Sequence, residues 1–201
     1  CSTYNIPENW SEKFDCVTSH FVLEHVSDPR SMLSDIRKLT KQGGHLFLSV
    51  PNIFTNSGDF LVADHINHFS RSSLQLILNM SGFRILKVDE TIFTGAFVVT
   101  AIADETASDL TTGSSILEAE ILKLQTIVDF WTGLSSKIDQ IIETYKDKPT
   151  AIYGAGFYGS LIYSKLINHM EIDCFIDRNP HVAGTNHFTK PVISPDSLDP
   201  N

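Results

Sequence analysis

The chain has 201 residues, 42% of them hydrophobic and 19% charged, which is ordinary for one globular domain or two small ones. Its formal net charge of -9 argues against a nucleic-acid partner, because binding to a phosphate backbone needs a cationic surface. We therefore expect a small-molecule substrate. Cys1, Cys16 and Cys174 lie far apart without CxxC spacing, so we expect reduced thiols in a cytoplasmic protein, without a disulfide framework. With no membrane span or signal peptide visible, we expect no membrane partner.

Residues 14–52 predict a strand, a helix and a second strand. Asp28 followed by Pro29 begins the helix, because an Asp cap accepts backbone N–H bonds and Pro at the first helical position loses no donor. We expect the helix to end at Gly43 and Gly44, since glycine readily takes a positive φ. A strand, helix and strand in this order build a parallel α/β sheet, whose ligands lie beyond the carboxyl ends of the strands.

Two stretches carry a family resemblance. The run FDCVTSHFVLEHV, followed by a helix and then by GGHLFLSVPN, resembles the fourth and fifth strands of class I S-adenosylmethionine-dependent methyltransferases. The resemblance covers residues 12–103 and implies S-adenosyl-L-methionine as the cofactor. In that family a strand, a glycine-rich turn and an acidic residue come earlier in the chain. None of these precedes Phe14, so we expect this sequence to be a fragment, truncated at both ends.

Beyond the second strand, Ser70 caps a predicted helix that Gly82 ends. Residues 83–90 and 91–103 then read as two strands, as in the antiparallel pair that closes the sheet of the resembled family. An acidic stretch rich in Thr, Ser and Gly at 104–115 predicts a linker, and a long helix follows to about Tyr145.

The long helix carries apolar residues at the alternating spacing of a heptad seam. Packing on the chain's own domains is one reading of this seam, and a homodimer through residues 116–145 is the other. The seam residues are Leu117, Ile121, Leu124, Val128, Trp131, Ile138, Ile142 and Tyr145.

His65 is the candidate catalytic base, with Asp64 as the carboxylate that orients it. An imidazole can take a proton from an acceptor hydroxyl or an acidic carbon near neutral pH. The resemblance to sugar C-methyltransferases points the same way, because they carry a Glu-His pair before an aromatic residue and Ser, with His as the base. Asp64 replaces that Glu here. A purely structural His65 stays open, whereas His65 with His68 as a metal pair lacks a third ligand by spacing.

The corner after the first strand is the expected cofactor contact. In the resembled fold the chain there passes beside the methionine part of the cofactor, mostly through backbone atoms. The residues expected at this contact are Ser19, His20, Phe21 and His25.

The run GAGFYG predicts a second nucleotide-type turn. Gly154, Gly156 and Gly159 follow a predicted strand and open a helix, and Asp177 ends the next strand, where it can bind ribose hydroxyls. This part also resembles the Rossmann-like tail of sugar C-methyltransferases and the N-terminal modules of nucleotide-sugar acyltransferases. A nucleotide-sugar contact, a dinucleotide such as NAD and a fold without ligand all remain open.

The expected fold class is α/β. An incomplete Rossmann-like methyltransferase sheet covers 1–103, a linker and long helix cover 104–147, and a small, partial Rossmann-like unit covers 148–201. The expected function is S-adenosylmethionine-dependent methyl transfer to a small acceptor, a sugar or nucleotide sugar. The alternatives are a non-catalytic nucleotide-sugar binding module and an NAD-binding oxidoreductase.

Overall fold

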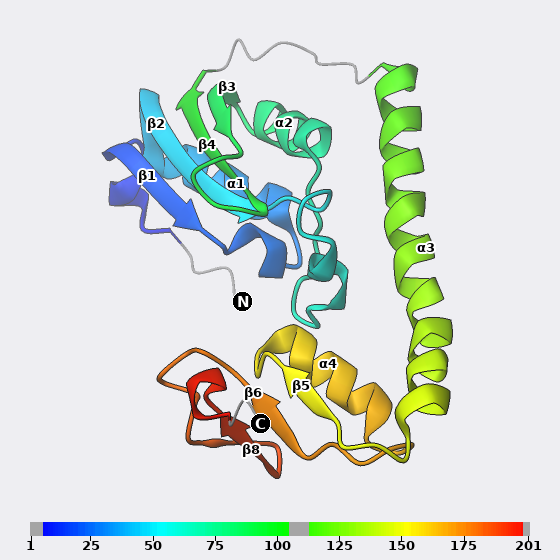
Figure 1. Cartoon of the computed structure of the whole chain (residues 1–201). Helices are drawn as coiled ribbons and strands as arrows, with labels where there is room; N and C mark the ends of the chain where they lie inside the picture. Colours follow the sequence, from blue (N-terminus) through cyan, green and yellow to red (C-terminus); the bar gives the residue numbers. More distant parts are fainter. Residues whose placement is uncertain (1–5, 105–112, 199–201) are drawn as a thin grey trace. The chain divides into compact units, whose positions relative to one another are not determined.

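The computed structural model describes residues 6–104 and 113–198, which divide into two compact units, 1–127 and 128–201 (Figure 1). The long helix α3, Ser114–Tyr145, contributes its first part to one unit and its remainder to the other. It confirms the long helix predicted from the sequence. Most of the predicted linker at 104–115 lies outside the described residues.

Unit 1 is built on a four-stranded mixed sheet in the order β1-β2-β4-β3, as far as the described residues extend. β1 is Phe14–His20, β2 is Thr40–Pro51, β3 is Phe83–Asp89 and β4 is Ala96–Ala103. β1 and β2 run parallel, whereas β4 is antiparallel to both β2 and β3. The predicted parallel pair and the predicted antiparallel pair are both confirmed.

Helix α1, Pro29–Leu39, connects the two parallel strands. It begins as predicted, because the Asp28 carboxylate accepts a bond of 3.0 Å from the backbone N–H of Ser31. It ends earlier than predicted, at Thr40, whose hydroxyl donates to the carbonyl of Ile36 at 2.7 Å.

The two glycines predicted to end α1 lie inside β2 instead. Gly43 has a φ of 75°, and a Cβ on Gly44 would lie 2.9 Å from the Lys41 carbonyl oxygen. The pairing of β1 with β2 is irregular beside them, between Phe14 and Cys16. These glycines therefore allow the start of the strand to bend rather than stop the helix.

Helix α2, Arg71–Met80, begins at Ser70 as predicted. The Ser70 hydroxyl accepts from the backbone N–H of Ser73 at 3.1 Å, and the Ser73 hydroxyl closes the reciprocal bond. Gly82, with a φ of 78°, follows the helix as expected. Between β2 and α2 the chain forms a loop that contains the 3-10 turn η3, Ser57–Leu61.

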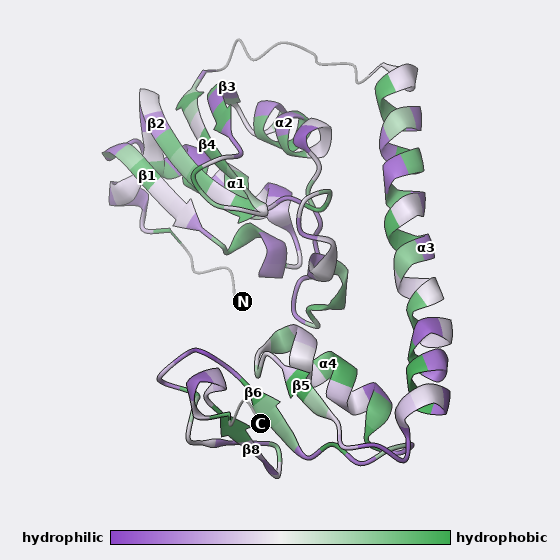
Figure 2. Ribbon diagram, viewed as in Figure 1, coloured by the Kyte–Doolittle hydropathy of each residue, from purple (hydrophilic) through white to green (hydrophobic). Residues whose placement is uncertain are grey.

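The core of unit 1 joins the sheet to α1 and α2, and strand β4 within it is mostly hydrophobic in Figure 2. Alternate residues of a strand point to opposite faces, so Leu46, Leu48 and Val50 of β2 are fully buried together. Opposite β4 residues join them in register, as in the pair of Leu48 with Val99. Leu33 of α1 packs into the same cluster. Truncating such a side chain to Ala costs about 2–5 kcal/mol.

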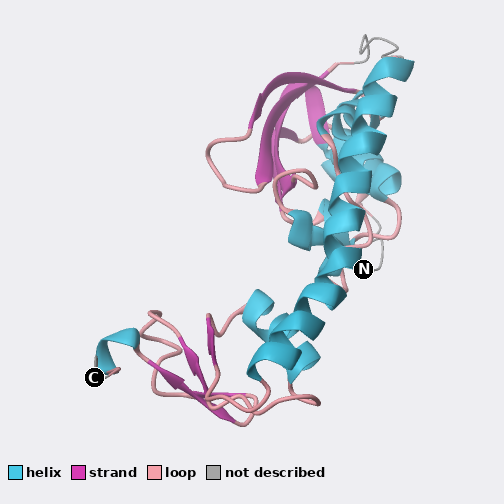
Figure 3. Cartoon of the chain, turned by 45° about the vertical axis from the view of Figure 1, so that its right-hand side comes forward, coloured by secondary structure: helices cyan, strands magenta, loops and turns pink. Residues whose placement is uncertain are grey.

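Unit 2 is a small α/β layer in which helix α4, Phe157–Leu166, follows the strand β5, Ala151–Tyr153 (Figure 3). β5, β6 (Cys174–Ile176) and β8 (Lys190–Ile193) are parallel, and β7 (Asn186–His187) pairs antiparallel to β8. The strand, turn, helix and strand predicted for this part are present.

Three further 3-10 turns lie in the connections, η1 (Glu8–Trp10), η2 (Leu23–His25) and η4 (Pro195–Ser197). Cys16 and Cys174 are free thiols. Among the helices of the described residues, none combines the length and apolarity that crossing a bilayer requires.

Candidate functional site

The carboxyl ends of β1 and β2 lie side by side in unit 1, because the strands are parallel and His20 stands opposite Ser49. His20 Nδ1 lies 3.0 Å from the Ser49 hydroxyl, which links the two strand ends. Directly after β1, Phe21 has a φ of 52°, a conformation that is uncommon for a residue other than glycine and is often found at functional sites.

The other predicted cofactor contacts are distributed around this corner. Ser19 is buried, and its hydroxyl has no hydrogen-bond partner among the described residues. The exposed ring of Phe21 meets Phe93 edge-on, with 6.0 Å between centroids. His25 lies in the next turn, η2, a few residues after this corner.

Asp59 holds two histidines of the loop between β2 and α2. One carboxylate oxygen lies 2.6 Å from Nδ1 of His65, and the other lies 2.6 Å from Nδ1 of His68. Asp59 is fully buried, and η3 fixes its place in the loop. Because a carboxylate accepts hydrogen bonds, both rings carry their hydrogen on Nδ1. In the neutral imidazole, a hydrogen on Nδ1 leaves the lone pair on Nε2.

The carboxylate beside His65 is thus Asp59, whereas the sequence suggested its neighbour Asp64. Asp64 is largely exposed and lies beside His25 instead. Nδ1 of His25 is 3.0 Å from the Asp64 carbonyl oxygen and 3.3 Å from its carboxylate. Adjacent residues in an extended loop point in different directions, so sequence neighbours are poor partners for each other.

Glu24 lies under this cluster and is 1% exposed. Its carbonyl oxygen accepts from the backbone N–H groups of Ile66 and Asn67, which ties η2 to the histidine loop. Burial raises the pKa of the Glu24 carboxyl, and the nearby imidazoles of His25 and His65 oppose that effect. One carboxylate oxygen, Oε2, is buried without a hydrogen-bond partner in the described part of the chain.

Glu24, His25 and His65 converge. Each offers one ligand atom, and the three atoms lie within 4.8 Å of one another. The rings of His25 and His65 meet edge-on, with 4.7 Å between centroids. His68 stands apart from this group and packs against Phe60, so the HxxH spacing does not bring the two loop histidines to one point.

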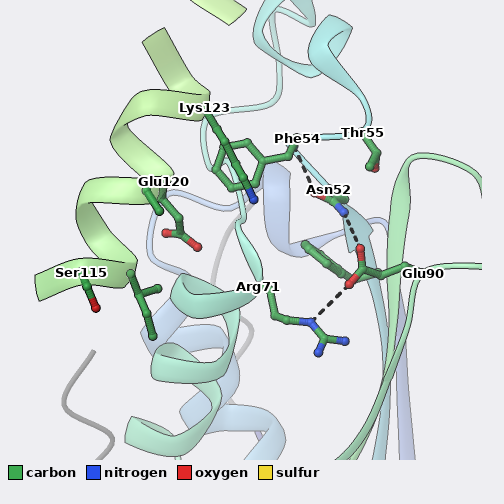
Figure 4. Close-up of a pocket in the computed structure, with 11 residues that line it drawn as sticks. Asn52, Phe54, Thr55, Arg71, Glu90, Ser115, Glu120 and Lys123 are labelled. Carbon is green, nitrogen blue, oxygen red and sulfur yellow. Dashed lines mark hydrogen bonds and ion pairs between the residues drawn. The ribbon is translucent and has the colours of Figure 1, made fainter. Parts of the chain in front are cut away.

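A cavity of about 470 Å³ opens next to the end of β2, within unit 1 (Figure 4). Asn52, the first residue beyond β2, is buried, and its amide donates to the Glu90 carboxylate at 3.2 Å. Arg71 donates to the other oxygen of Glu90, also at 3.2 Å. Lys123 of α3 lies over the ring of Phe54 at 5.2 Å. The cavity therefore combines charged and amide groups with an aromatic face.

The glycine-rich turn of unit 2 has the geometry of a close-packed strand-to-helix turn. Gly154 has a φ of 103°, and a Cβ on Gly159 would lie only 1.8 Å from the Gly154 carbonyl oxygen. By contrast, a Cβ on Gly156 would meet nothing within 4 Å. Asp177 accepts from the backbone N–H of Ala155 at 2.8 Å and of Asn179 at 2.8 Å, and these bonds lower the pKa of its carboxyl.

Sequence reasoning missed Asp59 and, apart from the strand end at Asn52, the residues of the cavity. Asp59 lies six and nine positions before its two histidines, a spacing that matches neither a helix nor a strand. The cavity joins Asn52 to Glu90 after β3 and to Lys123 on α3, which only the folded chain brings together. An Asn directly after a predicted strand was the one available signal.

Comparison with known proteins agrees with this geometry. The family model described as a methyltransferase domain matches residues 4–88. The ubiquinone biosynthesis O-methyltransferase of Proteus mirabilis (strain HI4320) is 42% identical over 48 residues, 24% of this chain and 20% of that protein. The enzyme of the same description from Vibrio atlanticus (strain LGP32) is 46% identical over 41 residues, 20% of this chain and 17% of that protein. The chain spans about a fifth of the length of these curated relatives.

Among solved structures, the chain is similar to an S-adenosylmethionine-dependent methyltransferase from Mesorhizobium loti, 16% identical, with a TM-score of 0.41 over 50% of this chain and 65% of that one. A second is such an enzyme from Aquifex aeolicus, 20% identical, with a TM-score of 0.38 over 51% of this chain and 52% of that one. The family match over residues 4–88 agrees with the resemblance to methyltransferases.

Proposed function

We propose that the protein containing this chain transfers a methyl group from S-adenosylmethionine to a small acceptor, a sugar or nucleotide sugar. The observation that carries the proposal is the parallel pair β1 and β2 within the methyltransferase-domain match, with the buried Asp59 holding His65 in the loop beyond the second strand. Bound ligands in open α/β sheets lie beyond these carboxyl ends.

The corner after β1 supports the cofactor assignment. Ser19 offers a buried hydroxyl without a partner among the described residues, and the backbone at Phe21 is held in an uncommon conformation. In the proposed enzyme His20, Phe21 and His25 line this corner beside the cofactor, which supplies an electrophilic methyl group when bound. The residues of this chain hold the two reactants in line, and orientation provides much of the acceleration.

His65 takes the proton of the acceptor in this proposal. Asp59 holds Nδ1 and leaves the lone pair of Nε2 free to accept a proton from a hydroxyl or an acidic carbon. The side chain of His65 is 15% exposed, so the ring is positioned and still reachable. Asp64, the other catalytic candidate from the sequence, acts through His25 rather than through His65.

The cavity beside β2 supports a sugar acceptor. Its lining offers amide, carboxylate and guanidinium groups at Asn52, Glu90 and Arg71, which suit the hydroxyl groups of a sugar. The ring of Phe54 adds an apolar face, and Lys123 adds a positive charge for a phosphate of a nucleotide sugar.

Calorimetric titration of the full-length protein with S-adenosylhomocysteine, then with nucleotide sugars, tests the proposal. We expect both to bind. His65→Ala should bind S-adenosylhomocysteine as the wild type does and lose turnover by about 10²–10⁴-fold. Absence of S-adenosylhomocysteine binding would remove the proposed activity, and unchanged turnover in the variant would remove the role of His65.

A non-catalytic nucleotide or nucleotide-sugar binding module is the second candidate, favoured by the turn at Gly154, Gly156 and Gly159. The same turn would suit NAD, which an oxidoreductase would require. Titration with NADH, followed by cofactor fluorescence, separates the redox reading from the nucleotide-sugar reading. Binding of a nucleotide sugar without methyl transfer would favour the module.

Self-association through residues 116–145 and a cytoplasmic location belong to the proposal as well. Leu117, Ile121 and Val128 lie on one seam of α3 and are each about half exposed, at 55%, 54% and 47%. A second copy of the helix would cover them. Light scattering on the full-length protein, with Leu117→Glu as the disrupting variant, measures whether a dimer forms.

A further inference from the structure

Glu24, His25 and His65 present three metal-ligand atoms to one point beside the end of β1. One oxygen of Glu24 lies 4.0 Å from Nε2 of His25, and all three ligand atoms lie within 4.8 Å of one another. Two imidazoles and one carboxylate are a ligand set that zinc binds in proteins, with a fourth position left open.

The far side of each imidazole is already held. Nδ1 of His25 faces the carbonyl and carboxylate oxygens of Asp64, and Nδ1 of His65 faces the Asp59 carboxylate. Histidines that bind a metal generally donate their other ring N–H to a carboxylate or a carbonyl, which fixes the tautomer. The structure shows this arrangement at both rings, so each Nε2 is left as the ligand atom.

Glu24 supplies an independent indication. Its side chain is 1% exposed, and Oε2 has no hydrogen-bond partner in the described part of the chain. An unpaired buried acceptor costs about 1–3 kcal/mol, and more when the group is charged. Oε1 is the oxygen that lies 4.0 Å from Nε2 of His25, so a cation held there by both carboxylate oxygens would also give Oε2 a partner.

We propose that Glu24, His25 and His65 bind a divalent transition-metal ion of the Zn²⁺ class. Zn²⁺ lies about 2.0–2.2 Å from nitrogen and oxygen ligands, so tetrahedral ligand atoms are about 3.3 Å apart. Ligand atoms that lie up to 4.8 Å apart must therefore approach each other by up to about 1.5 Å. His25, which is 32% exposed, has room for this rotation.

Metal binding would inhibit the proposed methyl transfer, and this consequence rests on the proposed function. A bound ion takes the lone pair of His65 Nε2, the same lone pair that accepts the acceptor's proton. Loading the site therefore inhibits turnover, and a chelator restores it. Zinc binding itself needs neither cofactor nor acceptor, so it is measured separately from the activity.

Calorimetric titration of the full-length, chelator-treated protein with ZnCl₂ tests the site. We expect the wild type to bind Zn²⁺. Loss of a residue that only contacts a ligand weakens metal affinity by about 10–100-fold, and His25→Ala, which removes a ligand, should weaken it further. Glu24→Gln, which keeps the shape of the side chain, should weaken it similarly. His45→Gln is the matched control, because His45 lies on β2 outside the cluster, and it should bind Zn²⁺ as the wild type does.

Equal zinc affinity in His25→Ala, Glu24→Gln and wild type would overturn the site, as would absence of binding. Circular dichroism verifies that each variant is folded. If Glu24→Gln unfolds, His25→Ala still tests the site, because His25 is partly exposed. ZnCl₂ should inhibit the wild type more strongly than it inhibits His25→Ala, with the turnover of each protein expressed relative to its own zinc-free rate, and equal inhibition would overturn the regulatory consequence. Activation by ZnCl₂ would overturn that consequence and the role of His65 as base. If the protein binds Zn²⁺ as expected but the zinc-free form transfers no methyl group, the proposed function alone is contradicted.

Discussion

Asp59 and His65 are joined by a 2.6 Å contact between a fully buried carboxylate oxygen and Nδ1 of the ring. Because the other oxygen of the same carboxylate contacts His68, one buried acid fixes two imidazoles of the loop. The ring orientation of His65 thus depends on a residue six positions earlier, and not on its sequence neighbour.

Asp59→Asn should lower kcat for methyl transfer by about 10²-fold or more, because the two rings contact different carboxylate oxygens and one of these becomes an NH₂ group. That group donates, so it favours the wrong tautomer of the ring that it faces. The affinity for S-adenosylhomocysteine should stay unchanged. Steady-state kinetics of the full-length protein, with calorimetry for binding, measure both quantities.

Asp64→Asn is the matched comparison, since it changes a neighbouring carboxylate that lies 3.3 Å from His25. Its effect on kcat should be clearly smaller than that of Asp59→Asn. A larger loss in Asp64→Asn would return the orienting role to Asp64.

The strands at the site could be predicted from the sequence, whereas the side-chain pairs could not. Apolar runs and the Asp28 cap are local signals, and they placed the ends of β1 and β2 beside each other correctly. The contacts of Asp59 arise in an irregular loop, where no period relates one residue to another. Loop geometry depends on long-range bonds such as Ile66 N–H to the carbonyl of Glu24, which a linear pattern does not contain.

Ser70→Ala should destabilise unit 1 by about 0.5–2 kcal/mol, because it removes the N-cap of α2. The variant also loses the bond of 3.0 Å from the Ser70 hydroxyl to Glu120 on the first part of α3. Thermal unfolding followed by circular dichroism measures the change. Ser34→Ala on the exposed surface of α1 is the control, and an equal loss in both variants would contradict the capping role.

The end of α1 shows where a local signal misleads. Glycine is a general stop signal, but Thr40 already satisfies the last carbonyls of the helix through its hydroxyl and backbone N–H. The chain then pairs with β1, and strand pairing takes Gly43 and Gly44 into β2. Tertiary pairing outweighed the local preference here.

Gly159→Ala should destabilise unit 2 by about 1–3 kcal/mol or more, because the new Cβ would lie 1.8 Å from the backbone oxygen of Gly154. Gly133→Ala in α3 should instead stabilise its helix by about 0.5–1 kcal/mol, since its Cβ meets nothing within 4 Å. Hydrogen exchange resolved to residues 128–198 compares the two, and equal protection in both variants would contradict the close packing.

Gly156→Ala separates a ligand-binding turn from a structural one. Its Cβ has open space in the structure and its φ is -98°, so the stability of unit 2 should change little. A nucleotide diphosphate that approaches the turn closely would meet the added methyl group, so binding of a nucleotide sugar or NADH should weaken. Calorimetry measures the affinity of Gly156→Ala for each ligand. Unchanged affinity would show that the turn does not hold the diphosphate.

Asp177 gives unit 2 a defined dependence on pH. Backbone N–H groups of Asn179 and Ala155 hold the pKa of its carboxyl below the ordinary value of 3.8 in the folded state. The ionised form therefore stabilises the fold above pH 3.8, and this contribution is lost as the pH falls through the lower, folded-state pKa. Asp177→Asn should be less stable than the wild type at pH 7, and the difference should shrink below pH 3.8. Unfolding of unit 2 followed by hydrogen exchange between pH 7 and pH 2 measures this, and a difference that stays constant over the range would contradict the bonded carboxylate.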